Sequence, residues 1–410
     1  MDKRRVILPI ILFIAMAIVC GASGFASEKT IRLEVDGVRQ EETLRVDLFT
    51  RVRLVFRHGG QYGRFCKNEC SGNAEECLRE LNGDFYEYMV ALCDRLTTEP
   101  IEPETTFSKD GFRYEEGVSG RAVDREKLFA DVIGSLDSGG VVTVSFLPVQ
   151  PRNGVDDLRK KTQKIASFST DYSTSATGRK TNVAVACDRI DGTTVPSGGR
   201  FSFNETVGER KEENGFKQAK IIVDGAFVEG IGGGVCQVST TVYDAWMLAG
   251  LTAERAAAHS LPVTYAPPSL DAMVSSTSDL VLFNDGDSPV YLKVRADGKK
   301  IVVDVFGEPS GYEIKLRSVT EKILPAGYVD KEIDLDWQEE ESARIVKEGK
   351  DGRVSASYRD FYAEGKLVRS EFLRRNVYKP QDGERAIRKD VKKPTEIPSV
   401  FFALSSITPW

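Results

Sequence analysis

The sequence predicts an α+β protein of several domains, in which strand-rich modules accompany one central helix. The chain has 410 residues, which is enough for two to four domains. Apolar residues alternate with polar ones along much of it, as they do in half-buried strands. In residues 237–249 they instead recur every three or four positions, and Gly250 follows, so this segment predicts a helix that ends at a glycine.

Composition excludes some classes of function. The net charge is -6 with a pI near 5.4, and no basic patch is interleaved with aromatic residues, so nucleic acid is not an expected partner. The two histidines, His58 and His259, are too few for a histidine-rich metal site, and no metal or cofactor is expected. His58 has no second histidine or acidic cluster near it in the sequence, so we expect an exposed residue in the turn 57–60.

The N-terminus predicts export. Lys3, Arg4 and Arg5 precede an apolar run over residues 6–19, and small residues follow as far as Ser27. This order is typical of a secretory signal peptide, and the run is also at the short end of what a membrane anchor needs. We therefore expect residues 1–27 to be a signal peptide or an N-terminal anchor. The rest of the chain is then expected in the cell envelope, membrane-anchored or secreted.

Residues 28–151 are predicted to form the first domain. The periodicity of their apolar residues predicts strands at 31–35, 44–48, 52–56 and 141–149 and helices at 78–97 and 124–135.

Four cysteines lie close together in this domain: Cys66, Cys70, Cys77 and Cys93. Three, six and fifteen residues separate them in turn, which is not the paired spacing of a typical zinc site. Because export favours oxidation, we expect two disulfides among the four, with all three pairings open.

The most distinctive stretch is GIGGGVCQVSTTVYDAWMLAGL at residues 230–251. It places Cys236 at the predicted start of the central helix, after the glycines at 232–234. Unpaired N–H groups and the helix dipole favour a thiolate at such a position. Glycines there also let backbone amides converge on an anion. Cys187 could instead pair with Cys236 in a disulfide, which would remove the nucleophile.

Several motifs in order resemble the VanW-like family. They are the stretch above, HSLPVTY at 259–265, FSTDYS at 168–173, PSGGRFSFNETVGER at 196–210 and DAMV at 271–274. The resemblance predicts a VanW-like domain over residues 165–308, with departures from the family pattern at Ala257, Ala258 and 267–270. It implies a bacterial cell-envelope protein, in a family that accompanies some glycopeptide-resistance systems, and it does not imply a particular reaction.

Two flanking regions carry further resemblances. The motifs at 107–114 and 117–123 resemble a proposed peptidoglycan-binding domain that often precedes VanW-like domains. This resemblance covers about residues 71–151 and predicts that the first domain, 28–151, binds peptidoglycan. Residues 311–380, with strands punctuated by glycines, resemble a G-five domain, a small β module of wall-associated proteins, and 381–410 are expected to be a tail. These resemblances imply peptidoglycan or a cell-wall peptide as the partner, with membrane contact only through an uncleaved N-terminal segment.

Two functions remain open at this stage. In the first, the protein is an accessory factor in wall metabolism or glycopeptide response that binds peptidoglycan or its stem peptides. Loop amides then hold a peptide carboxylate, and Tyr243 and Trp246 could stack on sugars. The candidate substrate-binding residues are Gly232, Gly233, Gly234, Gln237, Ser239 and Thr240.

In the second, the protein is an amidase or transpeptidase acting on peptidoglycan stem peptides. Cys236 is then the nucleophile and His259 the base, with Asp271 or Asp279 orienting the imidazole. The two candidate catalytic residues stand 23 positions apart, on either side of the predicted helix.

Overall fold

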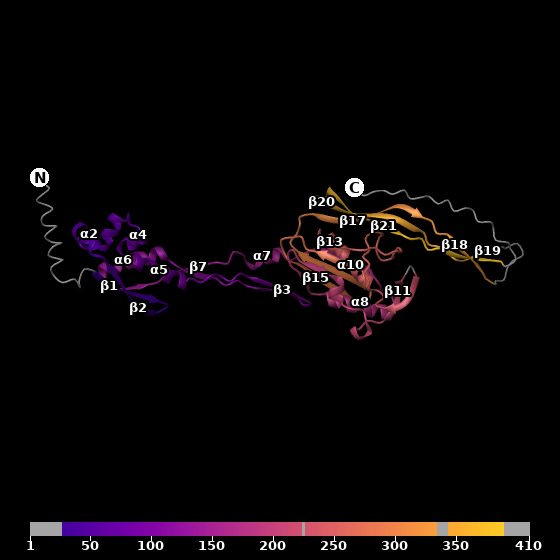
Figure 1. Ribbon diagram of the computed structural model, residues 1–410, viewed down its shortest axis with the longest axis horizontal. Helices are drawn as coiled ribbons and strands as arrows, with labels where there is room; N and C mark the ends of the chain where they lie inside the picture. Colours follow the sequence, from indigo (N-terminus) through magenta and orange to yellow (C-terminus); the bar gives the residue numbers. More distant parts are fainter. Residues whose placement is uncertain (1–26, 224–225, 334–342, 389–410) are drawn as a thin grey trace. The chain divides into compact units, whose positions relative to one another are not determined.

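The computed structural model describes residues 27–223, 226–333 and 343–388 (Figure 1). It is an α+β, multi-domain protein, which confirms the predicted fold class. The chain divides into two compact units. The first unit contains the described residues up to Glu104 together with Tyr114–Leu158. The second contains Thr105–Arg113 and the described residues from Arg159 onward. The predicted leader lies outside the described residues, apart from Ser27.

In the first unit a small sheet is covered by helices. Its strands are β1 (Ser27–Val35), β2 (Val38–Val46) and β6 (Val141–Thr143), in the order β2-β1-β6. Its helices are α2 (Leu48–His58), α3 (Tyr62–Glu69), α4 (Ala74–Leu81), α5 (Gly83–Leu96) and α6 (Arg125–Ser138). A separate pair joins β5 (Gly120–Val123) to β7 (Phe146–Val149). Among the described residues, no helix is both long and apolar enough to cross a membrane.

The strand predicted at 52–56 is wrong, because these residues belong to α2. The carboxylate of Asp47 accepts a hydrogen bond from the Thr50 N–H at the start of this helix, and Gly59 ends it in the left-handed conformation. Both are strong helix boundaries. They outweigh the short alternation of apolar residues that suggested a strand.

The prediction for His58 is also wrong. The side chain is buried at the end of α2, and its Nε2 lies 3.0 Å from a carboxylate oxygen of Glu69. Its ring meets Phe65 edge to face. Glu69 follows eleven positions later in the sequence, and α3 carries it back against α2. His58 therefore has a structural role in the core of the first unit.

The four cysteines of this unit are buried and free, so the two predicted disulfides are not present in the structure. The thiols of Cys66 and Cys70 both interact with that of Cys77, and burial raises the pKa of all three thiols. Cys66 and Cys70 thus both lie next to the sulfur of Cys77, which the spacing in the sequence does not reveal.

The second unit is built around an antiparallel sheet with the order β8-β16-β15-β9. Its strands are β8 (Gln163–Asp171), β9 (Thr193–Val195), β15 (Val290–Ala296) and β16 (Lys300–Gly307). Two helices, α8 (Thr177–Ile190) and α10 (Val235–Leu248), pack against this sheet and against each other. Alternate residues such as Val303 and Val305 join their core, in which Trp246 is fully buried.

The other residues of β15 and β16 meet a hairpin from earlier in the chain. This hairpin consists of β3 (Glu104–Ser108) and β4 (Gly111–Glu115), and its Phe107 and Phe112 contact Tyr291 and Phe306. The predicted first domain, residues 28–151, therefore includes a segment that packs in the second unit. Sequence order alone did not indicate this insertion.

Smaller elements complete this part of the second unit. A three-stranded sheet has the order β10-β14-β13, with β10 (Arg200–Ser202), β13 (Thr252–Arg255) and β14 (Val281–Phe283). A hairpin of β11 (Gln218–Val223) and β12 (Ala226–Ile231) leads into α10. Two short helices are α9 (Phe203–Val207) and the 3-10 helix η1 (Glu212–Asn214), while α7 (Val155–Lys160) spans the boundary at which the first unit ends and the second resumes.

The C-terminal β region belongs to the same unit. Its first sheet, of order β17-β20-β21, comprises β17 (Glu313–Leu324), β20 (Gly352–Ala363) and β21 (Lys366–Tyr378). Its second, of order β18-β22-β19, comprises β18 (Tyr328–Glu332), β19 (Ala343–Lys347) and β22 (Gly383–Ile387). The β region therefore continues past 380, where the tail was predicted to begin.

Arg359 of β20 joins the β region to the end of α10. Its Nη1 donates to the backbone oxygen of Leu251 at 2.7 Å, and its Nη2 lies 2.7 Å from the Glu371 carboxylate. The guanidinium is buried, and a cation beside the carbonyls at the C-terminal end of a helix is favourable. This contact helps to hold the helix that carries Cys236 against the β region.

We predict that Arg359→Gln lowers the free energy of unfolding by about 2–3 kcal/mol, because it removes charge-assisted hydrogen bonds and leaves buried acceptors unpaired. The matched control is Arg375→Gln, which breaks an ion pair with Glu321 in which the arginine is 62% exposed. That change is expected to cost less than about 1 kcal/mol. Urea unfolding followed by circular dichroism measures both, and equal losses would contradict the assignment.

Candidate active site

The N-terminus of α10 positions Cys236 at a cavity. Gly234 caps the helix with φ 103°, in the left-handed region that favours glycine, and Cys236 lies in the first turn. The Sγ atom lies 3.3 Å from the backbone oxygen of Val274. Cys236 is a free thiol, and so is the buried Cys187 of α8, so the alternative disulfide between them is not formed.

The glycines before Cys236 make room for close packing. A Cβ on Gly233 would lie 2.4 Å from the backbone oxygen of Lys220 in β11. A Cβ on Gly232 would lie 3.0 Å from the Cβ of Arg210, and one on Gly234 would lie 2.8 Å from the Cγ of Arg179. Because the three glycines lack side chains, the start of α10 can lie close to β11 and to the side chains of Arg179 and Arg210.

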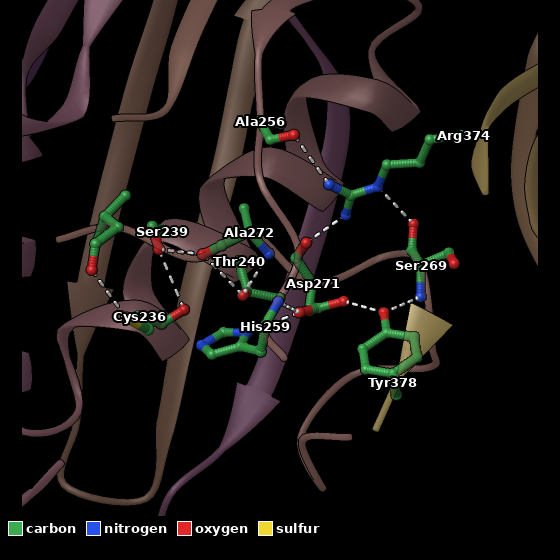
Figure 2. Close-up of polar contacts among 11 residues, drawn as sticks. Cys236, Ser239, Thr240, Ala256, His259, Ser269, Asp271, Ala272, Arg374 and Tyr378 are labelled. Carbon is green, nitrogen blue, oxygen red and sulfur yellow. Dashed lines mark hydrogen bonds and ion pairs between the residues drawn. The ribbon is translucent and has the colours of Figure 1, made fainter. Parts of the chain in front are cut away.

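His259 returns to the same place after the helix. Thr252–Arg255 form strand β13, so the chain leaves α10 in extended form and does not make a second helix. Both the backbone N–H and the Nδ1 of His259 bond to Oδ2 of Asp271, at 2.7 and 2.6 Å. Since the carboxylate can only accept, Nδ1 carries a proton and Nε2 is left for Cys236, with which the imidazole interacts. Figure 2 shows the ring between Cys236 and Asp271.

Asp271 is itself held by two residues of β21. The hydroxyl of Tyr378 donates to Asp271 Oδ1 and accepts from the Ser269 N–H. Arg374 donates to the backbone oxygens of Asp271 and Ser269 (Figure 2). Asp271 is fully buried, so its two carboxylate oxygens are satisfied by His259 and Tyr378 without solvent.

The electrostatics of these three residues are coupled. Burial opposes charge on the Cys236 thiol, but the hydrogen bond and positive charge of His259 lower its pKa below the usual range. Burial also opposes charge on the imidazole, but Asp271 and Cys236 together raise the pKa of His259 to about 9. His259 likewise holds the pKa of Asp271 low against the effect of burial. These shifts favour a thiolate and an imidazolium beside a carboxylate.

A cavity of about 1070 Å³ opens onto Cys236 and His259. Its lining includes the glycines 232–234, Gln237, Tyr265 and the two arginines Arg179 and Arg210. Of the predicted substrate-binding residues, the glycines and Gln237 thus reach the cavity. Nothing in the described part of the chain groups three or more histidine, cysteine or acidic side chains in a way that could hold a metal ion.

Other predicted binding residues are structural. Ser239 and Thr240 are fully buried and bond to the backbone of Ala272, which ties α10 to the segment that carries Asp271 (Figure 2). Tyr243 and Trp246 are buried in the core, so they do not present rings for sugar stacking. All four residues follow Cys236 closely on the same helix. They lie on the sides of α10 that pack against the sheet and the β region, so they are not available to a substrate.

Of the two candidate carboxylates, the structure brings only Asp271 to His259. Asp279 instead accepts from the Ser202 hydroxyl and the Asn204 N–H at the start of α9. Arg374 and Tyr378 were not found from the sequence. No local pattern relates either residue to Asp271, which precedes them by more than a hundred positions.

Residues 178–306 match the family described as "VanW like protein". The VanW-like region contains Cys236, His259 and Asp271, and the match supports the predicted resemblance. The chain is 34% identical over 146 residues to "Uncharacterized protein YoaR" of Bacillus subtilis (strain 168), covering 35% of this chain and 48% of that protein. It is 26% identical over 133 residues to "Vancomycin B-type resistance protein VanW" of Enterococcus faecalis (strain ATCC 700802 / V583), covering 31% and 48%. The chain thus matches about half the length of these relatives.

A solved structure named "Crystal structure of HP0197-G5" matches a smaller part. It is 23% identical, covers 19% of this chain and 99% of that one, and superposes with a TM-score of 0.13. This score is too low to carry an argument about the fold, so the G-five resemblance of 311–380 stays a prediction. The resemblance to a peptidoglycan-binding domain likewise stays a prediction.

We predict that iodoacetamide alkylates Cys236 at lower pH than it alkylates an ordinary exposed thiol, because the lowered pKa raises the thiolate fraction at a given pH. In His259→Gln the reaction should need a higher pH, since the stabilising imidazolium is gone. Mass spectrometry of the modified peptides measures the rates. Cys187 is the internal control, because burial raises its pKa to about 12 and it should stay unmodified. An ordinary thiol profile for Cys236 in the wild type would contradict the ion pair.

Proposed function

We propose that the second unit is a cysteine-dependent acyl-transfer enzyme acting on peptidoglycan stem peptides, as an amidase or a transpeptidase. The observation that carries this proposal is the chain of contacts from Cys236 through His259 to buried Asp271 at the wall of one cavity. A nucleophile, a base and a residue that orients the base are the parts this chemistry needs. A protein that only binds wall peptides needs no such arrangement.

The choice of substrate class rests on the comparisons. One relative is named as a vancomycin resistance protein, which agrees with the cell-envelope role that the family resemblance implies. The predicted leader and the two flanking resemblances agree with a location in the cell envelope. We therefore propose that the protein is exported and that peptidoglycan is its partner. Its role would then lie in wall metabolism or in the response to glycopeptides.

The reaction begins at the thiolate. Cys236 Sγ donates an electron pair to the carbonyl carbon of a stem-peptide amide and forms a C–S bond. The negative charge that develops on the carbonyl oxygen is favoured near the N-terminus of α10, the positive end of the helix dipole. His259 Nε2 then gives its proton to the leaving nitrogen, the C–N bond breaks, and a thioester and a free amine result.

The second half regenerates the thiol. Water, or the amine of another stem peptide, attacks the thioester carbonyl while neutral His259 takes a proton from it. The C–S bond breaks and leaves the thiolate beside the imidazolium again. Water gives a carboxylic acid, and an amine gives a new cross-link, so access to the cavity decides between hydrolysis and transpeptidation. Asp271 keeps Nδ1 protonated and Nε2 directed at Cys236 throughout.

We predict that purified protein converts stem-peptide or muropeptide substrates, and that Cys236→Ala abolishes turnover. His259→Ala should lose about 10²–10⁴-fold, the usual contribution of a general acid and base. Liquid chromatography with mass spectrometry measures the products. Cys187→Ala is the matched control, because it removes a buried thiol outside the cavity and should keep its turnover. Turnover that survives Cys236→Ala would contradict the proposal, as would peptidoglycan binding without turnover in any variant.

A further inference from the structure

Two arginines line the cavity beside Cys236 without a carboxylate partner. Arg179 comes from α8, and Arg210 follows α9. Each side chain is partly buried, and in the described part of the structure each bonds only to uncharged side chains. By contrast, the buried Arg359 of the same unit is paired with the carboxylate of Glu371. Asp279 interacts with Arg210 electrostatically but no hydrogen bond joins the two, so both guanidinium groups can still take a ligand anion at this cavity.

Arg179 is fixed in place by a chain of hydrogen bonds. Its Nη2 donates to Gln237 Oε1 at 2.6 Å, and its Nη1 donates to the Ser175 hydroxyl. Gln237 in turn donates to the Thr170 hydroxyl at 3.0 Å and to the backbone oxygen of Asp171 at 2.8 Å. Gln237 is fully buried, so it serves to orient the guanidinium. The predicted role of Gln237 as a direct substrate ligand is therefore replaced by this indirect one.

Arg210 has an unused donor. Its Nη2 donates to Asn204 Oδ1 at 2.5 Å, while its Nε is buried and has no hydrogen-bond partner in the structure. A buried donor without an acceptor is costly, and most are satisfied in folded proteins. Arg210 as a residue lines the cavity, so its guanidinium is within reach of a ligand bound there.

The glycines before Cys236 leave room for both arginine side chains. Gly232 faces the aliphatic part of Arg210, and Gly234 faces that of Arg179, each too closely for a side chain. Burial lowers the pKa of both guanidinium groups, so an anion bound by them in the cavity would relieve an unfavourable charge. Both arginines also interact electrostatically with the Cys236 thiol, which places the charge near the reacting atom.

We propose that Arg179 and Arg210 form a binding site for a substrate carboxylate next to the scissile bond. Planar guanidinium groups bind carboxylates in this way more specifically than lysine does. The substrate would then be a stem peptide with a free carboxylate close to the carbonyl that Cys236 attacks. This inference rests on the proposed function for the identity of the substrate, but the anion site itself is testable without turnover.

The first experiment compares two alkylating reagents on Cys236, iodoacetate and the neutral iodoacetamide. In both, the thiolate displaces iodide and forms a C–S bond, so their rate ratio reports the attraction of a carboxylate and cancels changes in thiol reactivity. We expect the rate with iodoacetate divided by the rate with iodoacetamide to fall at least about fivefold in Arg179→Gln and in Arg210→Gln, because each change removes a charge-assisted contact to the carboxylate. Arg210→Lys keeps the charge, so it should restore the ratio in part. Rising ionic strength should lower it in the wild type.

The matched control is Lys211→Gln. Lys211 lines the same cavity but is exposed and lies 2.5 Å from the Glu209 carboxylate, so its charge is already neutralised and the ratio should not change. Reaction with iodoacetamide and a thermal melt show that each variant is folded. A ratio that stays at the wild-type value in both folded arginine variants would overturn the proposal.

The second experiment compares a stem peptide with a free C-terminal carboxylate and its amide. The wild type should prefer the acid in kcat/KM by about tenfold or more, and the arginine variants should lose this preference. If no peptide is turned over but the alkylation ratio changes as expected, the anion site stands and the proposed reaction fails. If turnover depends on Cys236 but neither the ratio nor the preference changes, the reaction stands and this inference fails.

Discussion

The second unit depends on one buried contact, the double hydrogen bond from His259 to Asp271. A single carboxylate oxygen accepts from the backbone N–H and from the ring of the same histidine. This fixes both the course of the chain at His259 and the tautomer of its imidazole. A buried carboxylate is stable only when it is paired and fully hydrogen-bonded, so Tyr378 on the other oxygen is part of the same requirement.

That requirement links two regions that look separate in the sequence. The VanW-like region supplies Cys236, His259 and Asp271, while β21 supplies Tyr378 and Arg374. The guanidinium of Arg374 also lies 4.8 Å from the ring of Tyr243 in α10. The C-terminal β region thus contacts the residues that hold His259 in place, through Tyr378 and Arg374. A protein cut after the VanW-like match, which ends at residue 306, would lose these supports.

The features of the site that could be predicted are local ones. A cysteine after three glycines at a helix start has a recognisable pattern, and the short distance in sequence to His259 limits where that residue can lie. Asp271 was one of two candidates, because no pattern distinguishes it from Asp279. Tyr378 could not be predicted, since it lies 107 positions from its partner and a tyrosine in a strand is ordinary.

The errors in the fold have similar causes. Three alternating apolar residues in α2 resembled a strand, but the cap residues at its ends decide for a helix. Ser239 and Thr240 were assigned to substrate because they are polar and near Cys236. The structure uses them to bind the backbone of Ala272, so their polarity serves packing. Which face of α10 is covered depends on long-range strand order, which local sequence does not contain.

The central claim is that Asp271 and Cys236 together keep His259 charged at neutral pH, and NMR titration of the imidazole tests it most directly. Only two histidines are present, so His58→Gln leaves the ring signals of His259 alone. We expect them to titrate with a pKa of about 9 and to shift to lower pH in Asp271→Asn. A titration near the ordinary histidine value of about 6.5 in both proteins would contradict the account.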